Sequence, residues 1–84
     1  TKAGRALAKH GSRPGSAFLS TLGKSVPEIN KEAQEIVEDI LTHPGSTFDA
    51  YQHSRYGDII EVIAPDGRGL RYNARGTFIG FLEP

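Results

Sequence analysis

Several residue types are missing from this chain of 84 residues, and each absence excludes a class of protein. The chain has no cysteine, so neither a disulfide framework nor a thiolate metal site can stabilise it. No apolar run approaches the roughly 20 residues that cross a bilayer, so no membrane partner is expected. Methionine is absent even from the first position, and we therefore expect one domain, residues 1–84, that is a fragment of a longer protein.

Net charge is also absent, but the charges are unevenly distributed along the chain. Residues 1–24 carry five basic residues and no acidic one, whereas residues 25–50 carry six acidic residues and one lysine. A neutral total argues against nucleic-acid binding, because nucleic-acid-binding domains are usually basic. The segregated pattern nevertheless predicts that one positive face coexists with a neutral total. A chain this short has little room for an interior cofactor cavity, so we expect a shallow surface site without a cofactor.

Two helices are predicted in the N-terminal half. Residues 1–10 have the composition of a short helix with Gly11 in position to end it, and residues 11–24 form a loop. We expect Phe18 and Leu19 to fix this loop to the core. Ser25-Val26-Pro27-Glu28 has the form of a capping box, and an apolar stripe at helical spacing continues the second helix to about Thr42.

Four strands are predicted in the C-terminal half, where β-branched and alternating segments are separated by turn residues: 46–53, 58–64, 70–73 and 77–82. Connections this short give an antiparallel meander. The sequence therefore predicts an α+β domain in which both helices pack on one face of a four-stranded sheet and the other face stays open.

Most familiar catalytic motifs are absent. The three histidines, His10, His43 and His53, do not have the spacing of metal ligands, so no metal site is expected. No nucleophile-elbow pattern occurs, although a Ser-His-Asp arrangement is not excluded by composition. Gly67 and Gly69 form a Gly-x-Gly, but no helix follows them, and they are interpreted as turn glycines.

The remaining polar groups fit metal-free cleavage of RNA. That reaction needs a base for the 2′-hydroxyl, an acid for the leaving oxygen and cations for the phosphorane, roles that suit histidine, lysine and arginine. His10 beside Lys9, the segment His53-Ser54-Arg55, and Arg71 with Tyr72 and Thr77 are the groups available. Each has a simpler interpretation: a cation that ends a helix, a packing histidine, or an exposed strand arginine.

The chain resembles the C-terminal nuclease toxin domains of bacterial polymorphic and contact-dependent-inhibition proteins. The resemblance spans nearly the whole chain and rests on these segments: Lys9-His10-Gly11, Pro27-x-x-Asn30, Ile40-Leu41-Thr42-His43-Pro44, Arg55-Tyr56-Gly57-Asp58, Pro65-Asp66-Gly67-Arg68-Gly69 and Gly76-Thr77-Phe78-Ile79-Gly80-Phe81-Leu82-Glu83-Pro84. More distantly, the layout is similar to the tRNase domain of colicin D. The resemblance implies the barnase/EndoU/colicin/RelE-like fold and metal-independent cleavage of tRNA, commonly in the anticodon loop.

The same resemblance implies roles for particular residues. His10 matches the catalytic histidine of colicin D, and Lys9 matches the lysine beside it. The chain departs from the pattern at Gly80, where colicin D has a catalytic serine, and Thr77 or Tyr72 remains to supply a hydroxyl. Whether the turn at Arg75-Gly76 has two or three residues decides if Thr77 faces the side of Arg71 or that of Tyr72.

We therefore expect a monomeric ribonuclease toxin that acts on tRNA and is neutralised by a cognate immunity protein. It would be exported as part of a large bacterial surface or secreted protein and act in the cytoplasm of the target cell. The expected catalytic residues are His10, Lys9, Arg55, Arg71, Thr77 and His53, and the expected RNA-binding residues are Lys2, Arg5, Arg68, Tyr72 and Arg75. A ribonuclease of the same fold that acts on mRNA or rRNA, or a non-catalytic protein-interaction module, remains as an alternative.

Overall fold

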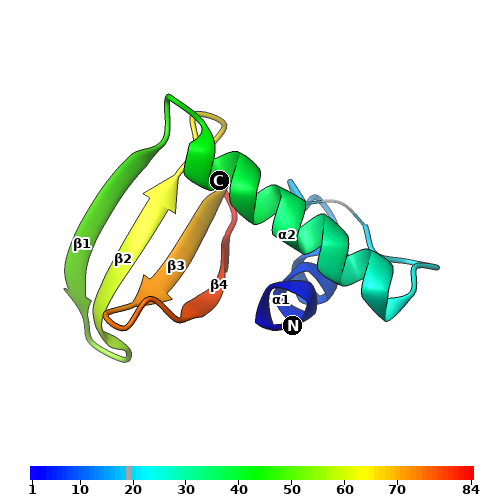
Figure 1. Ribbon diagram of the computed structural model, residues 1–84, viewed down its shortest axis with the longest axis horizontal. Helices are drawn as coiled ribbons and strands as arrows, with labels where there is room; N and C mark the ends of the chain where they lie inside the picture. The colour runs from blue at the N-terminus through cyan, green and yellow to red at the C-terminus, as the bar shows by residue number, and fades with distance from the viewer. Residues whose placement is uncertain (19) are drawn as a thin grey trace.

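The structure is a computed structural model that describes residues 1–18 and 20–84 (Figure 1). Two helices precede four strands in the order α1 (Lys2–Gly11), α2 (Val26–Thr42), β1 (Thr47–His53), β2 (Gly57–Ile63), β3 (Gly69–Asn73) and β4 (Phe78–Leu82). The predicted α+β class is confirmed, and the bounds of the elements lie close to the predicted ones. Leu19, which was expected to help fix the loop, lies outside the described residues.

The four strands form one antiparallel sheet in the order β1-β2-β3-β4. As Figure 1 shows, the C-terminal part of α2 lies against one face of this sheet, which we call the helix face, and α1 lies beside β4. The helix α1 therefore covers one edge of the sheet. At the other edge, all but the last residue of β1 are exposed.

The helix α2 forms as its sequence predicts. Its N-terminal amides are satisfied by a capping box in which the Ser25 hydroxyl accepts from the Glu28 amide and the Glu28 carboxylate accepts from the Ser25 amide. Ala33, Ile36, Val37 and Ile40 are buried, which is the stripe expected at 3.6 residues per turn. This stripe turns the acidic side of the helix toward solvent.

The helix α1 ends differently from the prediction. Gly11 was expected just after the helix, as a glycine cap. Instead it is the last residue of the helix, and its backbone is not in the left-handed conformation that such a cap requires. Ser12 is the C-cap instead, and its hydroxyl donates to the Lys9 carbonyl over 2.9 Å. The Arg13 amide donates to the His10 carbonyl over 3.0 Å. These bonds satisfy carbonyls of the last turn, so no glycine cap is needed.

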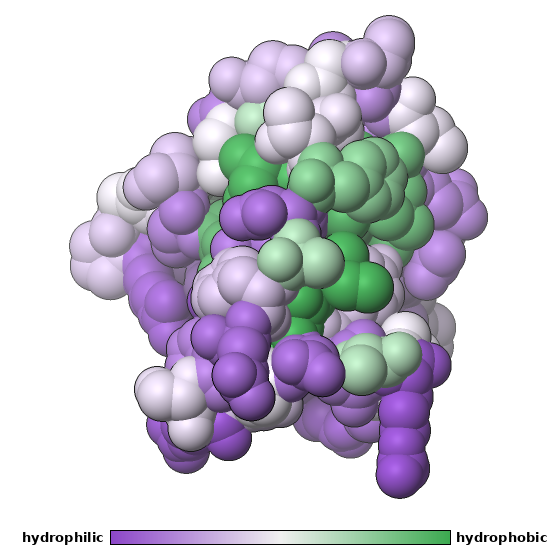
Figure 2. All heavy atoms as spheres, turned by 90° about the vertical axis from the view of Figure 1, so that its left-hand side faces the viewer, coloured by the Kyte–Doolittle hydropathy of each residue, from purple (hydrophilic) through white to green (hydrophobic). Residues whose placement is uncertain are grey.

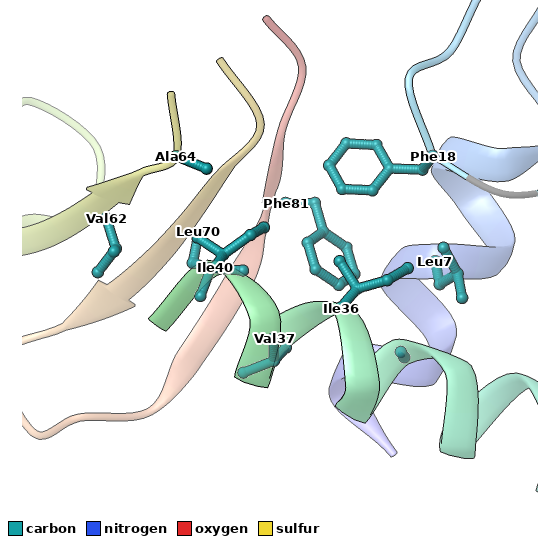
Figure 3. Close-up of a cluster of buried hydrophobic side chains, with 10 residues drawn as sticks. Leu7, Phe18, Ile36, Val37, Ile40, Val62, Ala64, Leu70 and Phe81 are labelled. Atoms are coloured by element: carbon teal, nitrogen blue, oxygen red, sulfur yellow. The ribbon is translucent and has the colours of Figure 1, made fainter. Parts of the chain in front are cut away.

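The hydrophobic core joins the two helices, the loop and the helix face of the sheet (Figure 3). Phe18 is buried in it, which confirms that this residue fixes the loop. The Phe81 ring lies 4.8 Å from the Phe18 ring between centroids. The buried members are Leu7, Phe18, Ala33, Ile36, Val37, Ile40, Val62, Ala64, Leu70 and Phe81. Side chains from β2, β3 and β4 thus hold α2, and through Leu7 they also hold α1.

A β-bulge shapes the edge of the sheet beside α1. Tyr72 is opposite Phe78 and Arg71 is opposite Gly80, so Ile79 is an extra residue in β4. In a regular strand, residues 78 and 81 would point to opposite faces. The bulge lets both rings reach the core, where their centroids are 5.2 Å apart.

Close contact between the helices fixes the position of α1. The Thr1 hydroxyl accepts from the Gly4 amide over 2.9 Å and donates to Asn30 Oδ1 over 3.0 Å. A Cβ at Gly4 would collide with that Asn30 oxygen, so any larger residue here requires the Asn30 side chain to move away from its bond with Thr1. The first turn of α1 is therefore anchored to α2 through a single amide side chain.

We predict that Gly4→Ala destabilises the fold by about 1–3 kcal/mol, because the added methyl group overpacks the helix contact. In an isolated helix the same exchange would stabilise by about 1 kcal/mol, so the sign of the change is diagnostic. Urea denaturation measures the free energy of unfolding. In an Asn30→Ala background the cost of Gly4→Ala should largely disappear, and an equal cost in both backgrounds would contradict this account.

Candidate active site

A groove of about 410 Å³ lies between α1 and β4. We call it the basic groove. Its α1 wall consists of Lys2, Arg5, Ala6, Lys9 and His10, and its β4 wall consists of Phe78, Ile79 and Gly80. Four residues that the sequence predicted for RNA binding or catalysis, namely Lys2, Arg5, Lys9 and His10, are thus in one site.

The α1 wall carries a row of cations. Lys2, Arg5 and Lys9 are spaced by three and four residues, so they share one side of the helix. Within residues 1–18 and 20–84, none of the three has a carboxylate within 4.0 Å. Their charges are therefore available to an anionic ligand in the groove, which agrees with the basic segment predicted at the start of the chain.

His10 is held rigidly at the end of this row. Its side chain is 12% exposed, and its Nδ1 lies 2.7 Å from Glu83 Oε2. The imidazole ring also packs against the Phe18 ring, with centroids 5.3 Å apart, and against the Phe81 ring at 6.2 Å. Two aromatic contacts and a charge-assisted hydrogen bond leave the ring little freedom to rotate.

Glu83 links the site to the loop after α1. Its carboxylate accepts from the Ala17 amide over 3.0 Å and from the Ser16 hydroxyl over 2.8 Å. Desolvation raises the pKa of Glu83, but the bonds from Ala17, His10 and Ser16 outweigh it and hold this pKa below its ordinary value. Glu83 is therefore ionised near neutral pH. Because an ionised carboxylate can only accept a hydrogen bond, the proton between the two groups is on Nδ1 of His10.

A neutral His10 in this tautomer has an unprotonated Nε2. Among the described residues, Nε2 makes no hydrogen bond, so it is available to take a proton from a ligand in the groove. Within residues 1–18 and 20–84, no three histidine, aspartate or glutamate side chains lie close enough together to bind a metal ion. The basic groove thus combines a proton acceptor with fixed positive charge, which suits acid–base chemistry on an anionic substrate.

Arg71 lies in a different cluster. Leu70 occupies the helix face, so by strand alternation the next residue points to the opposite, outer face. There Arg71 donates to Glu61 Oε2 from Nε over 2.8 Å, and the same oxygen accepts from the Tyr51 hydroxyl over 2.7 Å. The Arg71 guanidinium also lies 5.9 Å from the centre of the Tyr56 ring. It is not a lining residue of the basic groove.

The segment from His53 to Tyr56 belongs to this outer-face cluster. His53 Nδ1 accepts from the Arg55 amide over 3.0 Å, and the His53 ring is 4.9 Å from the Tyr56 ring. Arg55 lies 5.5 Å from the centre of the Tyr56 ring.

Figure 2 faces the β1 side of the molecule and shows apolar atoms gathered in the middle of a largely hydrophilic surface. Of the exposed large hydrophobic residues of β1 and β2, Tyr51 lies on the outer face, whereas Phe48 and Ile60 share the helix face with Val62.

The other residues expected to bind RNA have partners within the fold. Arg68 donates to Asp39 of α2 over 2.9 Å and to Asp66 over 2.7 Å, so it ties the β2–β3 turn to α2. Tyr72 is partly buried, with its ring 5.6 Å from the Phe78 ring. Arg75 is exposed, and its amide donates to Asn73 Oδ1 over 2.9 Å.

The position of Thr77 follows from the length of the β3–β4 turn. The Asn73 amide donates to the Thr77 carbonyl across three residues, 74–76, with Gly76 at a φ of 80°. Thr77 is therefore opposite Asn73 and on the side of Arg71, not on that of Tyr72. Its own amide donates to Asn73 Oδ1 over 2.9 Å.

Glu83 and Ser16 were not among the residues predicted from the sequence. Glu83 stands 73 positions after His10, and no spacing rule joins residues so far apart. Glu83 did lie in the terminal segment that carries the family resemblance, but it was not assigned a role. Only the packing of α1 beside β4 brings the two groups together.

A histidine beside a row of cations in a shallow groove is an arrangement that suits the chemistry of a nuclease. The family model for the CdiA C-terminal tRNase toxin domain matches residues 1–83. A 1.75 Å crystal structure of the toxic C-terminal tip of CdiA from Pseudomonas aeruginosa, in complex with its immune protein, is also similar. Its sequence is 32% identical, the TM-score is 0.80, and the match covers 96% of this chain and 86% of that one. No curated protein matches significantly.

The chain belongs to the CdiA C-terminal tRNase toxin domain family. It is therefore an endoribonuclease toxin domain. The expected family and fold are thereby confirmed. Neither helix in the described residues is long and apolar enough to span a bilayer.

We predict that Glu83→Gln lowers stability at neutral pH and that the deficit shrinks in acid. The pKa of Glu83 is lowered by folding, so its contribution is complete above the unfolded-state value of about 4.3. It is lost as the pH falls through the lower, folded-state pKa. Urea denaturation at pH 7 and pH 3 measures both differences. The matched control is Glu35→Gln, an exposed carboxylate on α2, and an equal Glu83→Gln deficit at both pH values would contradict the assignment.

Proposed function

We propose that His10 is the catalytic proton-transfer group of a metal-independent tRNA endonuclease. The observation that carries this proposal is the His10–Glu83 pair, with Nδ1 and Oε2 2.7 Å apart, in a groove lined by Lys2, Arg5 and Lys9. A carboxylate on Nδ1 fixes the tautomer and the orientation of the imidazole ring. Glu83 is therefore a positioning residue, because it acts through His10.

The reaction follows from the chemistry of RNA. Nε2 of His10 takes the proton from a ribose 2′-hydroxyl, and that oxygen attacks the adjacent phosphorus. The bond from phosphorus to the 5′-oxygen breaks, which leaves a 2′,3′-cyclic phosphate and a 5′-hydroxyl that receives a proton. Lys2, Arg5 and Lys9 neutralise the charge of the phosphorane. Lys9, adjacent to His10 in the chain, is the proposed donor to the leaving oxygen.

The proposed substrate is an unpaired segment of tRNA, such as the anticodon loop. In-line attack requires the 2′-oxygen to rotate behind the phosphorus, which a regular duplex resists. A shallow groove at the edge of a small domain is open to a looped-out strand. The family, whose name specifies a tRNase, supports this choice over mRNA or rRNA. We also propose that residues 1–84 are the toxic domain of a larger surface protein, delivered to act in the cytoplasm of the target cell.

The outer-face residues have a subordinate role in this proposal. Arg55 and Arg75 are exposed cations without an ion pair among the described residues, and we propose that they contact the RNA backbone away from the cleaved bond. Arg71, His53 and Thr77 hold internal contacts, which support a structural contribution. This replaces the expectation that they take part in the chemistry.

We predict that His10→Ala lowers the rate of cleavage of total tRNA in EDTA by about 10²–10⁴-fold, the range expected when a general acid–base group is removed. Gel analysis of tRNA at increasing times measures the rate. The matched control is His43→Ala, since His43 is an exposed histidine at the end of α2, outside the basic groove. It should cleave like the wild type.

Two results would contradict this proposal in different ways. Equal cleavage by the wild type and His10→Ala would remove His10 from the mechanism. Cleavage by the wild type that is abolished by EDTA and restored by a divalent cation would remove the metal-independent chemistry.

A further inference from the structure

The two walls of the basic groove are chemically different. The α1 wall carries the cations and His10, whereas the β4 wall has two apolar side chains, Phe78 and Ile79, and then Gly80. Phosphate groups would be attracted to the first wall. The second wall has no charged side chain, so any ligand group that lies against it is held by other forces.

Gly80 is unusual among the glycines of the sheet. At Gly69, an added Cβ would lie 2.7 Å from Ile63 Cδ1, and Gly57 at the start of β2 has a φ of 72°, so packing or backbone conformation explains both. At Gly80 neither reason applies, because its φ is not in the left-handed region and an added Cβ meets nothing within 4 Å. Glycine weakens a strand interior, and it often marks a bulge, such as the adjacent one at Ile79, or the close approach of a ligand.

The rest of the β4 wall is rigid and offers backbone polar groups. The Phe78 ring is braced edge-on by the Tyr72 ring at 5.6 Å and by the Phe81 ring at 5.2 Å. The bulge at Ile79 interrupts pairing with β3. Within the described sheet β4 pairs with β3 alone, so the backbone groups on its other side face α1 and the groove.

From these features we infer that the β4 wall is a nucleoside subsite: the ribose and base next to the cleaved phosphate lie against Phe78 and Ile79 and cover Gly80. The apolar surface accepts the flat face of the base, and the free strand edge provides hydrogen bonds to its polar edge or to the ribose. Because Gly80 has no side chain, the nucleoside can come close to the backbone of β4 at this position. The inference rests on the proposed function, because it names the part of the RNA that each wall binds.

The test measures binding of fluorescently labelled total tRNA to the His10→Ala protein, which keeps the RNA intact. Adding Gly80→Val should weaken binding at least tenfold, with an unchanged slope of log affinity against log salt concentration. Adding Lys9→Ala should instead reduce the magnitude of that slope by about 1, because one phosphate contact is lost. Inorganic polyphosphate, which has no nucleoside, should bind the Gly80→Val protein as it binds its parent, and the Lys9→Ala protein more weakly.

Controls separate the possible failures. Ala50→Val adds bulk to the exposed edge strand β1 and should not change tRNA binding. Thermal unfolding reports folding, and if Gly80→Val melts early, then Gly80→Ala, whose Cβ has open space, is the variant used. Unchanged tRNA affinity in the folded Gly80 variant, or a slope that changes as for Lys9→Ala, overturns the subsite alone. If the parent binds no tRNA, both the subsite and the proposed function are overturned.

Discussion

The hydrogen bond between His10 and Glu83 is the contact on which the site depends. It joins the last turn of α1 to the residue just after β4, so that the two ends of the chain form one functional unit. The same carboxylate holds the loop through Ser16 and Ala17. One ionised group thus fixes the His10 ring, its tautomer and the segment that packs over it. Partial burial raises the pKa of Glu83, but three hydrogen bonds to its charged carboxylate outweigh this effect.

The fold brings the groups together by packing α1 against an edge of the sheet. Gly4 permits close contact with α2, and Leu7 enters the core with Phe18 and Phe81. The cationic side of α1 is then left facing β4, where the bulge keeps Phe78 in the core and exposes the strand edge. A neutral protein can therefore carry a basic groove, because none of its described acidic residues lines that groove and five of the ten lie on α2.

Local patterns were enough to predict the elements, because each depends on neighbours in sequence. The capping box at Ser25, the stripe on α2 and the Asp66-Gly67 turn all act over a few residues. The site was harder to predict. Lys9 and His10 were found from residue chemistry, but the partner Glu83 depends on tertiary packing. Arg71 was expected near His10, yet strand alternation and its pairing with Glu61 keep it on the outer face.

The central claim is that Glu83 fixes the tautomer of His10. Nitrogen-15 NMR of the histidine side chains, recorded at a pH where the His10 ring is neutral, measures this directly. The account predicts that Nδ1 carries the proton and that Nε2 has the shift of an unprotonated nitrogen, with the pattern lost in Glu83→Ala, which has no acceptor for Nδ1. A His10 ring protonated on Nε2 in the wild-type protein would contradict it.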